Sequence, residues 1–399
     1  LTLYANSGAV SEFKELHNTV VVGNEKLSPT VLKGKRIFYN TADSRMAMDG
    51  YLACATCHFD GGSDHRVYDF TDRGEGLRNT ISLIGRAGTG HGRVHWSANF
   101  DEIQDFEHDI RFAFLGTGLM SDEDFAEANT TLGAAKAGRS ADLDALAAYT
   151  ASLNEFPVSP YRNANGSLTD KGAMGKSVFD AKGCADCHGG EAFTDSPNGN
   201  RHDVGTLKDS SGLRLHGVLG GIDTPTLRGL WDGAPYLHDG SAPTLADVLN
   251  NQSHGATNLL TDLEREQLVS YLLQIDGLEP AARDIRDGLR ISSLVHGQTY
   301  EGPSISLEVT TDLPNINEVQ WVVDDMPVTA VASAPYSATW KANRAGLHRV
   351  YAKAVYNNGL TATLSPEVTI NVEMVNQPVE LFVQGESYSN YHDTTAGNS

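Results

Sequence analysis

The spacing of apolar residues predicts helices in three parts of the chain. Residues 29–40 carry apolar side chains near helical spacing behind Pro29, a residue that suits the first turn of a helix. Residues 142–153 repeat apolar positions at i, i+3, i+4 and i+7 and end before Pro157. Residues 268–275 show the same spacing. We therefore expect an amphipathic helix in each of these stretches.

Beyond Pro280 the pattern changes to an alternation of apolar and polar side chains. Residues 304–310, 319–323, 348–355 and 367–372 alternate in this way, and turn-forming residues such as Asn357-Asn358-Gly359 separate them. Short strands at this spacing predict a β-sandwich. Asp325 and the segments 333–337 and 345–347 also resemble the bacterial immunoglobulin-like modules appended to secreted polysaccharide enzymes. The region has no charged cluster and no metal-ligand spacing, so we expect a spacer or docking module.

A five-residue motif occurs twice in the part of the chain that precedes these strands. Cys54-Ala55-Thr56-Cys57-His58 recurs as Cys184-Ala185-Asp186-Cys187-His188. Two thiols at this spacing can each add to a vinyl group of one haem, and the histidine that follows reaches the iron. The four cysteines are the only ones in the chain, so no further thiol completes a tetrahedral zinc site. The motif predicts two covalently bound haem c groups, with His58 and His188 as iron ligands.

The surroundings of the two motifs repeat as well. Gly34-Lys35-Arg36-Ile37-Phe38 before the first motif is matched by Gly175-Lys176-Ser177-Val178-Phe179 before the second. Helix, motif, long loop and helix therefore occur twice, which predicts two mainly α cytochrome c domains in tandem. We expect these domains at residues 1–160 and 161–280, an all-β immunoglobulin-like sandwich at 290–376, and a linker or truncated further module at 377–399.

Net charge and hydropathy limit the binding partners and the compartment that we expect for the protein. The chain has 399 residues and a formal net charge of −21, which argues against binding nucleic acid or an anionic membrane by charge. It has no apolar run of eighteen or more residues that would span a membrane. Haem c is attached outside the cytoplasm, so we expect a periplasmic or extracellular protein with a protein redox partner. Because the chain begins at Leu1 without a charged and apolar leader, we expect a processed chain or part of a longer one.

The occupant of the sixth coordination position of each haem iron determines what that haem can do. A second strong ligand makes an electron carrier, whereas an open position admits peroxide. Position along the chain does not choose among the candidates. For the first haem these are His65, His91, His95 and His108, and for the second they are Met174, His202, His216, His238 and His254.

Further segments resemble the bacterial dihaem cytochrome c peroxidase and MauG superfamily. These are Arg78-Asn79-Thr80 with His95-Trp96, and the blocks at 224–228 and 234–241, so that the likeness covers roughly residues 30 to 278. The resemblance implies that the N-terminal haem reacts with peroxide and that the C-terminal haem receives electrons. It also implies that Trp96 lies between the haems, and that a calcium ion is held by Asn79 and the backbone of Gly233 and Pro235.

The sequence departs from that superfamily at the expected sixth ligands. Where the family's second haem usually takes a methionine, this chain offers His254, which predicts a bis-histidine carrier of lower potential. His95 stands where the family has an apolar distal residue. We expect His95 to bind the first iron, with His91 as the alternative, although it could instead act as a base above an open site. Glu107 either supplies the family's distal carboxylate or lies on a solvated helix face.

The last twenty residues, 380–399, resemble the opening strand of a family 6 carbohydrate-binding module. Together these features favour a secreted dihaem cytochrome for electron transfer, tied to extracellular polysaccharide breakdown. The alternative is a dihaem peroxidase or MauG-like oxidase that acts at the N-terminal haem through His95, Trp96 and Glu107. A third possibility is a structural module whose haems support a larger surface complex.

Overall fold

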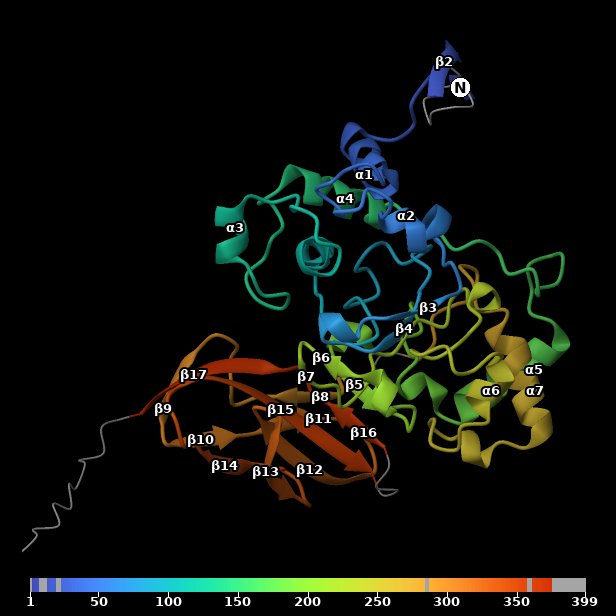
Figure 1. Ribbon diagram of the computed structural model, residues 1–399. Helices are drawn as coiled ribbons and strands as arrows, with labels where there is room; N and C mark the ends of the chain where they lie inside the picture. Colours follow the sequence, from blue (N-terminus) through green and yellow to red (C-terminus); the bar gives the residue numbers. More distant parts are fainter. Residues whose placement is uncertain (1, 7–12, 19–22, 284–286, 357–360, 375–399) are drawn as a thin grey trace, which may run out of the picture.

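The computed structural model describes residues 2–6, 13–18, 23–283, 287–356 and 361–374. The chain forms an N-terminal helical unit, a second helical unit and a β unit, which pack against one another (Figure 1). Strands β1 (Thr2–Asn6) and β2 (Phe13–Asn18) form an antiparallel hairpin ahead of them. A helical region followed by an antiparallel β region confirms the predicted fold class.

The N-terminal helical unit is built on the crossing of α1 (Pro29–Tyr39) and α4 (Ala141–Ala151). The hydroxyls of Ser28 and Ser140 cap the two helices by accepting backbone N–H groups. A Cβ at Gly34 would overlap the carbonyl oxygen of Ala145, so only glycine permits this approach. The other elements of the unit are short: α2 (Cys54–Cys57), β3 (Val67–Asp69), β4 (Leu77–Asn79) and α3 (Asp122–Glu127).

The second helical unit repeats this crossing with α5 (Asp170–Ala181) and α7 (Asp262–Leu272). Gly175 takes the place of Gly34, because a Cβ there would overlap the carbonyl oxygen of Gln267. Phe179, Tyr271 and Ile275 form the centre of its core. Helix α7 spans Asp262–Leu272, so it begins and ends earlier than the helix predicted at 268–275. The remaining elements are α6 (Leu245–Leu249), β5 (Arg201–Asp203), β6 (Leu213–Arg214) and β7 (Gly217–Val218).

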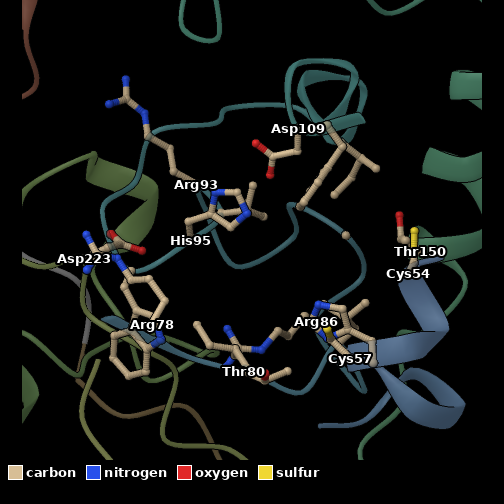
Figure 2. Close-up of a pocket in the computed structure, with 18 of the residues that line it drawn as sticks. Cys54, Cys57, Arg78, Thr80, Arg86, Arg93, His95, Asp109, Thr150 and Asp223 are labelled. Carbon is tan, nitrogen blue, oxygen red and sulfur yellow. The ribbon is translucent and has the colours of Figure 1, made fainter. Parts of the chain in front are cut away.

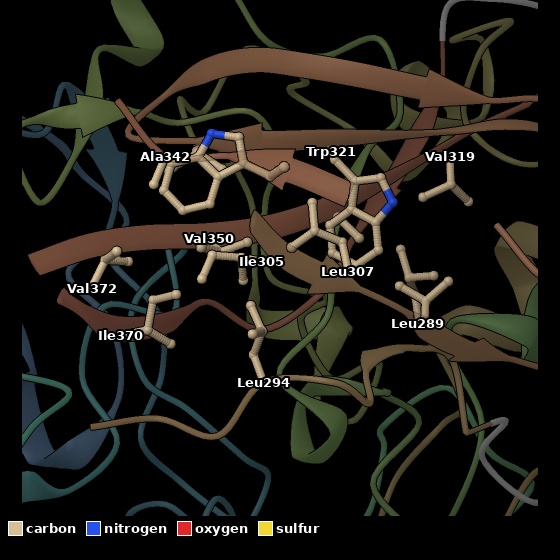
Figure 3. Packing of buried hydrophobic residues seen from close by; sticks show 14 of the residues in the cluster. Leu289, Leu294, Ile305, Leu307, Val319, Trp321, Ala342, Val350, Ile370 and Val372 are labelled. Carbon is tan, nitrogen blue, oxygen red and sulfur yellow. The ribbon is translucent and has the colours of Figure 1, made fainter. Parts of the chain in front are cut away.

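The β unit packs its strands around a core that includes Trp321, Val319 and Val350 (Figure 3). Its main sheet has the order β13-β12-β15-β16, and β17 pairs with both β15 and β9. Two separate two-stranded sheets, β10 with β14 and β8 with β11, complete the β unit. The strands are β8 (Leu289–Ile291), β9 (Thr299–Gly302), β10 (Ser304–Leu307), β11 (Val309–Thr311), β12 (Ile316–Val323), β13 (Met326–Val331), β14 (Ala338–Lys341), β15 (Gly346–Tyr356), β16 (Ala362–Leu364) and β17 (Val368–Met374).

The β unit shares a sheet with the second helical unit. Strand β16 pairs antiparallel with β5, in register from Ala362 opposite Asp203 to Leu364 opposite Arg201. The β unit is therefore joined directly to its neighbour, and its expected role as a spacer or docking module stays a prediction. The segment 380–399, expected to begin a carbohydrate-binding module, lies outside the described residues. In the part of the chain that is described, no helix is long and apolar enough to cross a membrane.

Candidate haem sites

The first motif forms one helical turn, α2, that carries both of its thiols. Cys54 and Cys57 stand three positions apart on this turn and therefore share a face. The next residue, His58, has its Nδ1 3.3 Å from the carbonyl oxygen of Gly62, to which Nδ1–H donates. Burial lowers the pKa of His58. The imidazole is therefore neutral, and its Nε2 lone pair is available to a metal.

A cavity of about 230 Å³ opens beside these residues (Figure 2). Cys54, Cys57 and His58 line it together with His91 and His95. Its other lining residues are largely apolar, and some come from the second helical unit, including Pro225. We refer to this place as site 1.

Two arginines give site 1 a positive charge. Arg86 and Arg93 both line the cavity, and within the described ranges neither side chain donates a hydrogen bond or forms an ion pair. Burial lowers the pKa of Arg86 to about 10, so it is still charged at neutral pH. Paired thiols, a free imidazole, apolar walls and unpaired guanidiniums fit haem c, whose propionates the two arginines would hold.

His95 is held in one tautomer by a chain of hydrogen bonds. Its Nδ1 lies 2.7 Å from Asn99 Oδ1, and Asn99 Nδ2 donates to Glu75 Oε1 at 3.0 Å. A carboxylate only accepts, so Asn99 must turn its NH₂ group to Glu75 and its oxygen to His95. The guanidinium of Arg73 also faces this Nδ1, at 3.1 Å, and can only donate, but the contact with the oriented Asn99 oxygen is shorter and favours a proton on Nδ1. Burial first, and the charge of Arg73 second, lower the pKa of His95 well below its usual value, which leaves Nε2 as a free lone pair.

A charged pair next to His95 was not found from the sequence. Arg73 forms an ion pair with Asp109 at 3.1 Å, and its guanidinium also lies 3.1 Å from His95 Nδ1. Burial raises the pKa of Asp109 to about 6, against the opposing effect of Arg73. Both residues line site 1. The buried acid Asp109 can give or take a proton, while the guanidinium of Arg73 adds a fixed positive charge beside the imidazole.

Glu107 fills neither of the roles expected for it. Its side chain is fully buried, which excludes a solvated helix face. Its carboxylate accepts hydrogen bonds from Arg111 and from the backbone N–H groups of Leu119 and Met120. It is absent from the lining of site 1. Glu107 therefore secures a loop, and the acids that line the cavity are Glu75, Asp109 and Asp223.

The remaining histidines of the N-terminal unit divide into two kinds. His65 is partly exposed and bonds the carbonyl oxygen of Ala234, whereas His108 packs against Phe125. Neither lines site 1. His91 does line it, stacked against Phe156. His91 thus stays the alternative to His95 as a sixth ligand.

The second motif brings the imidazole of His188 opposite a second imidazole, tilted from it by 39°, in a region that we call site 2. His188 Nδ1 lies 3.3 Å from the carbonyl oxygen of Phe193, the same arrangement as His58 with Gly62. The ring centres of His188 and His254 are 6.3 Å apart. Two imidazoles on one metal, with bonds of ~2 Å and about 1 Å from nitrogen to ring centre, stand ~6 Å apart. His254 Nδ1 is buried, and the described structure offers it no hydrogen-bond partner.

Burial keeps both rings of site 2 neutral. It lowers the pKa of His188 to about 4, and it lowers the pKa of His254 as well. Neutral imidazole is the form that binds iron. The pair fits the two axial positions of a haem attached to Cys184 and Cys187.

The other candidates for site 2 are less available than His254. His202 lies 4.0 Å from the Sγ of Cys187, but both of its ring nitrogens are bonded, to Asp195 at 2.7 Å and Thr363 at 3.0 Å. His238 Nε2 bonds the hydroxyl of Ser211 at 2.6 Å. His216 lies against Gly74 of the N-terminal unit. Met174 is an exposed residue of α5. Among these candidates, the geometry favours His254 as the second axial ligand at site 2.

Trp96 lies where the two helical units meet. Its indole Nε1 donates to the carbonyl oxygen of Asn79 at 2.8 Å, and its own carbonyl accepts the backbone N–H of Asp223 at 2.8 Å. Trp96 and Asp223 both line site 1. Burial raises the pKa of Asp223 to about 8. The structure thus places Trp96 at the interface, and its position between two haems stays a prediction.

Asn79 occupies a place that fits a cation. Its Nδ2 donates to the carbonyl oxygen of Pro235 at 2.5 Å, and its backbone N–H donates to the carbonyl oxygen of His238 at 2.7 Å. Its Oδ1 is buried without a hydrogen-bond partner among the described residues. A buried amide oxygen without a partner is a ligand that suits a hard cation such as calcium. The calcium ion, with the backbone of Gly233 and Pro235 as further ligands, stays a prediction.

Comparisons with known proteins agree with a haem-binding chain. Residues 221–257, which include His254, match a family model described as RoxA-like, cytochrome c-like. The chain is 29% identical over 277 residues to hydrazine synthase subunit gamma of Kuenenia stuttgartiensis, covering 58% of this chain and 74% of that protein. It is 24% identical over 280 residues to the methylamine utilization protein MauG of Methylophilus methylotrophus, covering 61% and 81%.

Two solved structures are also similar in part. A structure of hydrazine synthase from Kuenenia stuttgartiensis aligns with a TM-score of 0.47 at 27% identity, covering 63% of this chain and 88% of that one. Fibronectin(III)-like modules of Clostridium thermocellum CbhA align with a TM-score of 0.21 at 23% identity, covering 22% and 99%. From the sequence comparisons, the chain contains a cytochrome c-like region that is distantly related to dihaem cytochromes of the MauG kind, and such a region implies covalent haem c.

Proposed function

We propose that the chain is a dihaem c-type cytochrome that transfers electrons through a bis-histidine site 2. The observation that carries this proposal is the 6.3 Å separation of the His188 and His254 ring centres. A haem held by two imidazoles exchanges electrons without taking up a substrate. The polypeptide supplies what such a site needs: two neutral rings, burial, and a backbone carbonyl that orients His188.

For site 1 we propose that His95 supplies the second axial ligand. Its Nε2 lone pair is left free by the bond from Nδ1–H to Asn99, and its ring lines the same cavity as His58. Site 1 would then pass electrons to or from site 2 across the interface that holds Trp96. The second candidate function is peroxide reduction at site 1. It is supported by Arg73 and Asp109, which bring an exchangeable proton and a fixed positive charge to the cavity.

The setting is part of the proposal. Haem c is attached outside the cytoplasm, which supports a periplasmic or extracellular location, and the net charge of −21 suits a basic protein partner. A link to polysaccharide breakdown would rest on residues 380–399, which lie outside the described structure. It stays an expectation from the sequence.

The two functions separate when peroxide is added to the half-reduced protein. For electron transfer, stopped-flow absorption shows no rapid oxidation of either haem, and Asp109→Asn leaves that result unchanged. For peroxide reduction, oxidation is rapid, and Asp109→Asn slows it by roughly 10²–10⁴-fold because a proton donor is lost. Asp122→Asn is the matched control, since Asp122 is exposed and lies outside the lining of site 1.

A further inference from the structure

The β unit reaches the loop that carries His95 through one buried ion pair. Arg214 of β6 is 1% exposed and binds the carboxylate of Glu367, which lies between β16 and β17, at 2.5 Å. The same guanidinium donates to the carbonyl oxygens of Ser97 at 2.6 Å and Ala98 at 3.0 Å. These two residues follow His95 and Trp96 directly. Three segments that are far apart in the sequence thus meet at one side chain.

The carboxylate of Glu367 lies close to two further arginines besides Arg214. Arg201 of β5 lies 3.3 Å from its Oε1, and Arg349 of β15 lies 3.9 Å from the same atom. Burial alone would raise the pKa of Glu367, but the three arginines lower it to about 2. The carboxylate therefore stays ionised at any physiological pH and keeps Arg214 in place.

The His95 loop is held from its other side by Glu75. Ser97 Oγ and Asn99 Nδ2 both donate to Glu75 Oε1, at 2.9 and 3.0 Å. Ser97 and Ala98 are completely buried, so their carbonyl groups have no access to water if Arg214 withdraws. The loop position therefore depends on two anchors, one within its own unit and one that ends in the β unit.

We propose that the β unit positions the distal side of site 1, with Glu367 and Arg214 as positioning residues that set where the His95 ring stands relative to the iron. The inference rests on the proposed function in one respect, since site 1 must hold haem. It adds a role for the β unit beyond that of a spacer. A purely structural interface is the alternative, and it would affect stability without a selective effect on site 1.

The test compares the two haems of the intact holoprotein by low-temperature electron paramagnetic resonance. The variants are Glu367→Gln and the triple variant Glu367→Met/Arg214→Met/Arg201→Met, which leaves neither buried arginine without its carboxylate and so folds if the single variant does not. Glu367→Asp is the conservative rescue. Glu373→Gln is the matched control, because Glu373 is an exposed residue of β17.

We expect the site 1 signal to change its g-values or spin state in the first two variants, while the site 2 signal stays as in the wild type. The affinity of ferric site 1 for cyanide should rise roughly tenfold or more, in the range typical for loss of a group that orients a ligand. The proposal is overturned if every folded variant shows the wild-type site 1 signal, or if both signals change together. Failure of the proposed function would show separately, as a missing bis-histidine signal in Glu373→Gln and in the wild type.

Discussion

At the scale of single residues, the position of one proton decides what each histidine can do. The Nδ1–H groups of His58 and His188 each point at a backbone carbonyl, and that of His95 points at Asn99. In each ring this leaves Nε2 unprotonated. Imidazoles prepared in this way bind iron without first losing a proton.

Replacing Asn99 with leucine tests this account at site 1. The variant removes the acceptor for His95 Nδ1–H, so the ring loses its fixed tautomer and binds the iron less firmly. We expect the affinity of ferric site 1 for cyanide to increase roughly 10–100-fold. A spectrophotometric cyanide titration measures it, with His65→Ala as the control, since His65 lies outside the cavity. An unchanged affinity would mean that His95 is not the ligand.

Replacing His254 with methionine tests site 2. Thioether favours ferrous iron more than imidazole does, so the reduction potential of site 2 should rise, on the order of 0.1 V within the ~0.8 V that axial ligands span. A spectroelectrochemical titration resolves the two haems. A potential of site 2 that does not move would contradict ligation by His254.

At the scale of elements, two glycines set the architecture of both helical units. Gly34 lets α1 approach the backbone of α4, and Gly175 lets α5 approach the backbone of α7. The two glycines occupy equivalent positions in the repeated sequence. Each crossing places the following cysteine motif against the core of its unit.

Gly175→Ala should destabilise the second helical unit although alanine is the better helix former. The gain in helix propensity is about 1 kcal/mol, but the new Cβ meets the carbonyl of Gln267, and overpacking typically costs about 1–3 kcal/mol or more. We expect a lower thermal midpoint by calorimetry and less haem attached at site 2. Ser177→Ala, on the exposed face of α5, should do neither. A midpoint equal to that of the wild type would show that the helices can separate at no cost.

Helices with a regular apolar spacing were predictable from the sequence. The arrangement of acidic side chains on the distal side of site 1 was not. Apolar spacing located α1 and α4 to within two residues, and the motif with its repeat located the cysteines. Glu107 was misjudged and Asp109 was not found, because residues 101–114 do not form a regular α-helix. A 3₁₀ turn at Ile103–Phe106 is followed by a π-helix at Asp109–Ala113, so a 3.6-residue period assigns the faces wrongly.

The contact of β5 with β16 had no signal in the sequence for a related reason. Arg201–Asp203 is a three-residue strand with two charged side chains, and no alternation marks it. Its partner lies 160 residues further on, and only the assembled fold brings the two together. The pairing of Arg214 with Glu367 had no signal in the sequence either. Charged residues are usually exposed, and only the fold shows that these two are buried.

At the scale of the whole molecule, the three units are joined by buried charge. Glu367 has its pKa lowered to about 2, from an ordinary value of 4.5. A depressed pKa contributes stability above pH ~4.5 that is lost as the pH falls toward 2. The shift corresponds to on the order of 3 kcal/mol at neutral pH.

Glu367→Gln should therefore lower the free energy of unfolding at pH 7 by about 3 kcal/mol and flatten its decline between pH 4.5 and pH 2. Thermal unfolding followed by circular dichroism across this range measures both effects. Glu373→Gln should follow the wild-type curve, since Glu373 is exposed. Parallel acid curves for wild type and Glu367→Gln would show that the carboxylate does not join the units.

The most direct test of the central claim is the electron paramagnetic resonance spectrum of the fully oxidised protein, recorded for the wild type and for His254→Ala. With His188 and His254 as the two axial ligands, the wild type shows a low-spin ferric signal from site 2. In His254→Ala that signal is replaced by a high-spin signal, while the signal of site 1 is unchanged. A low-spin site 2 signal that persists without His254 would contradict the account, because another side chain would then close the iron.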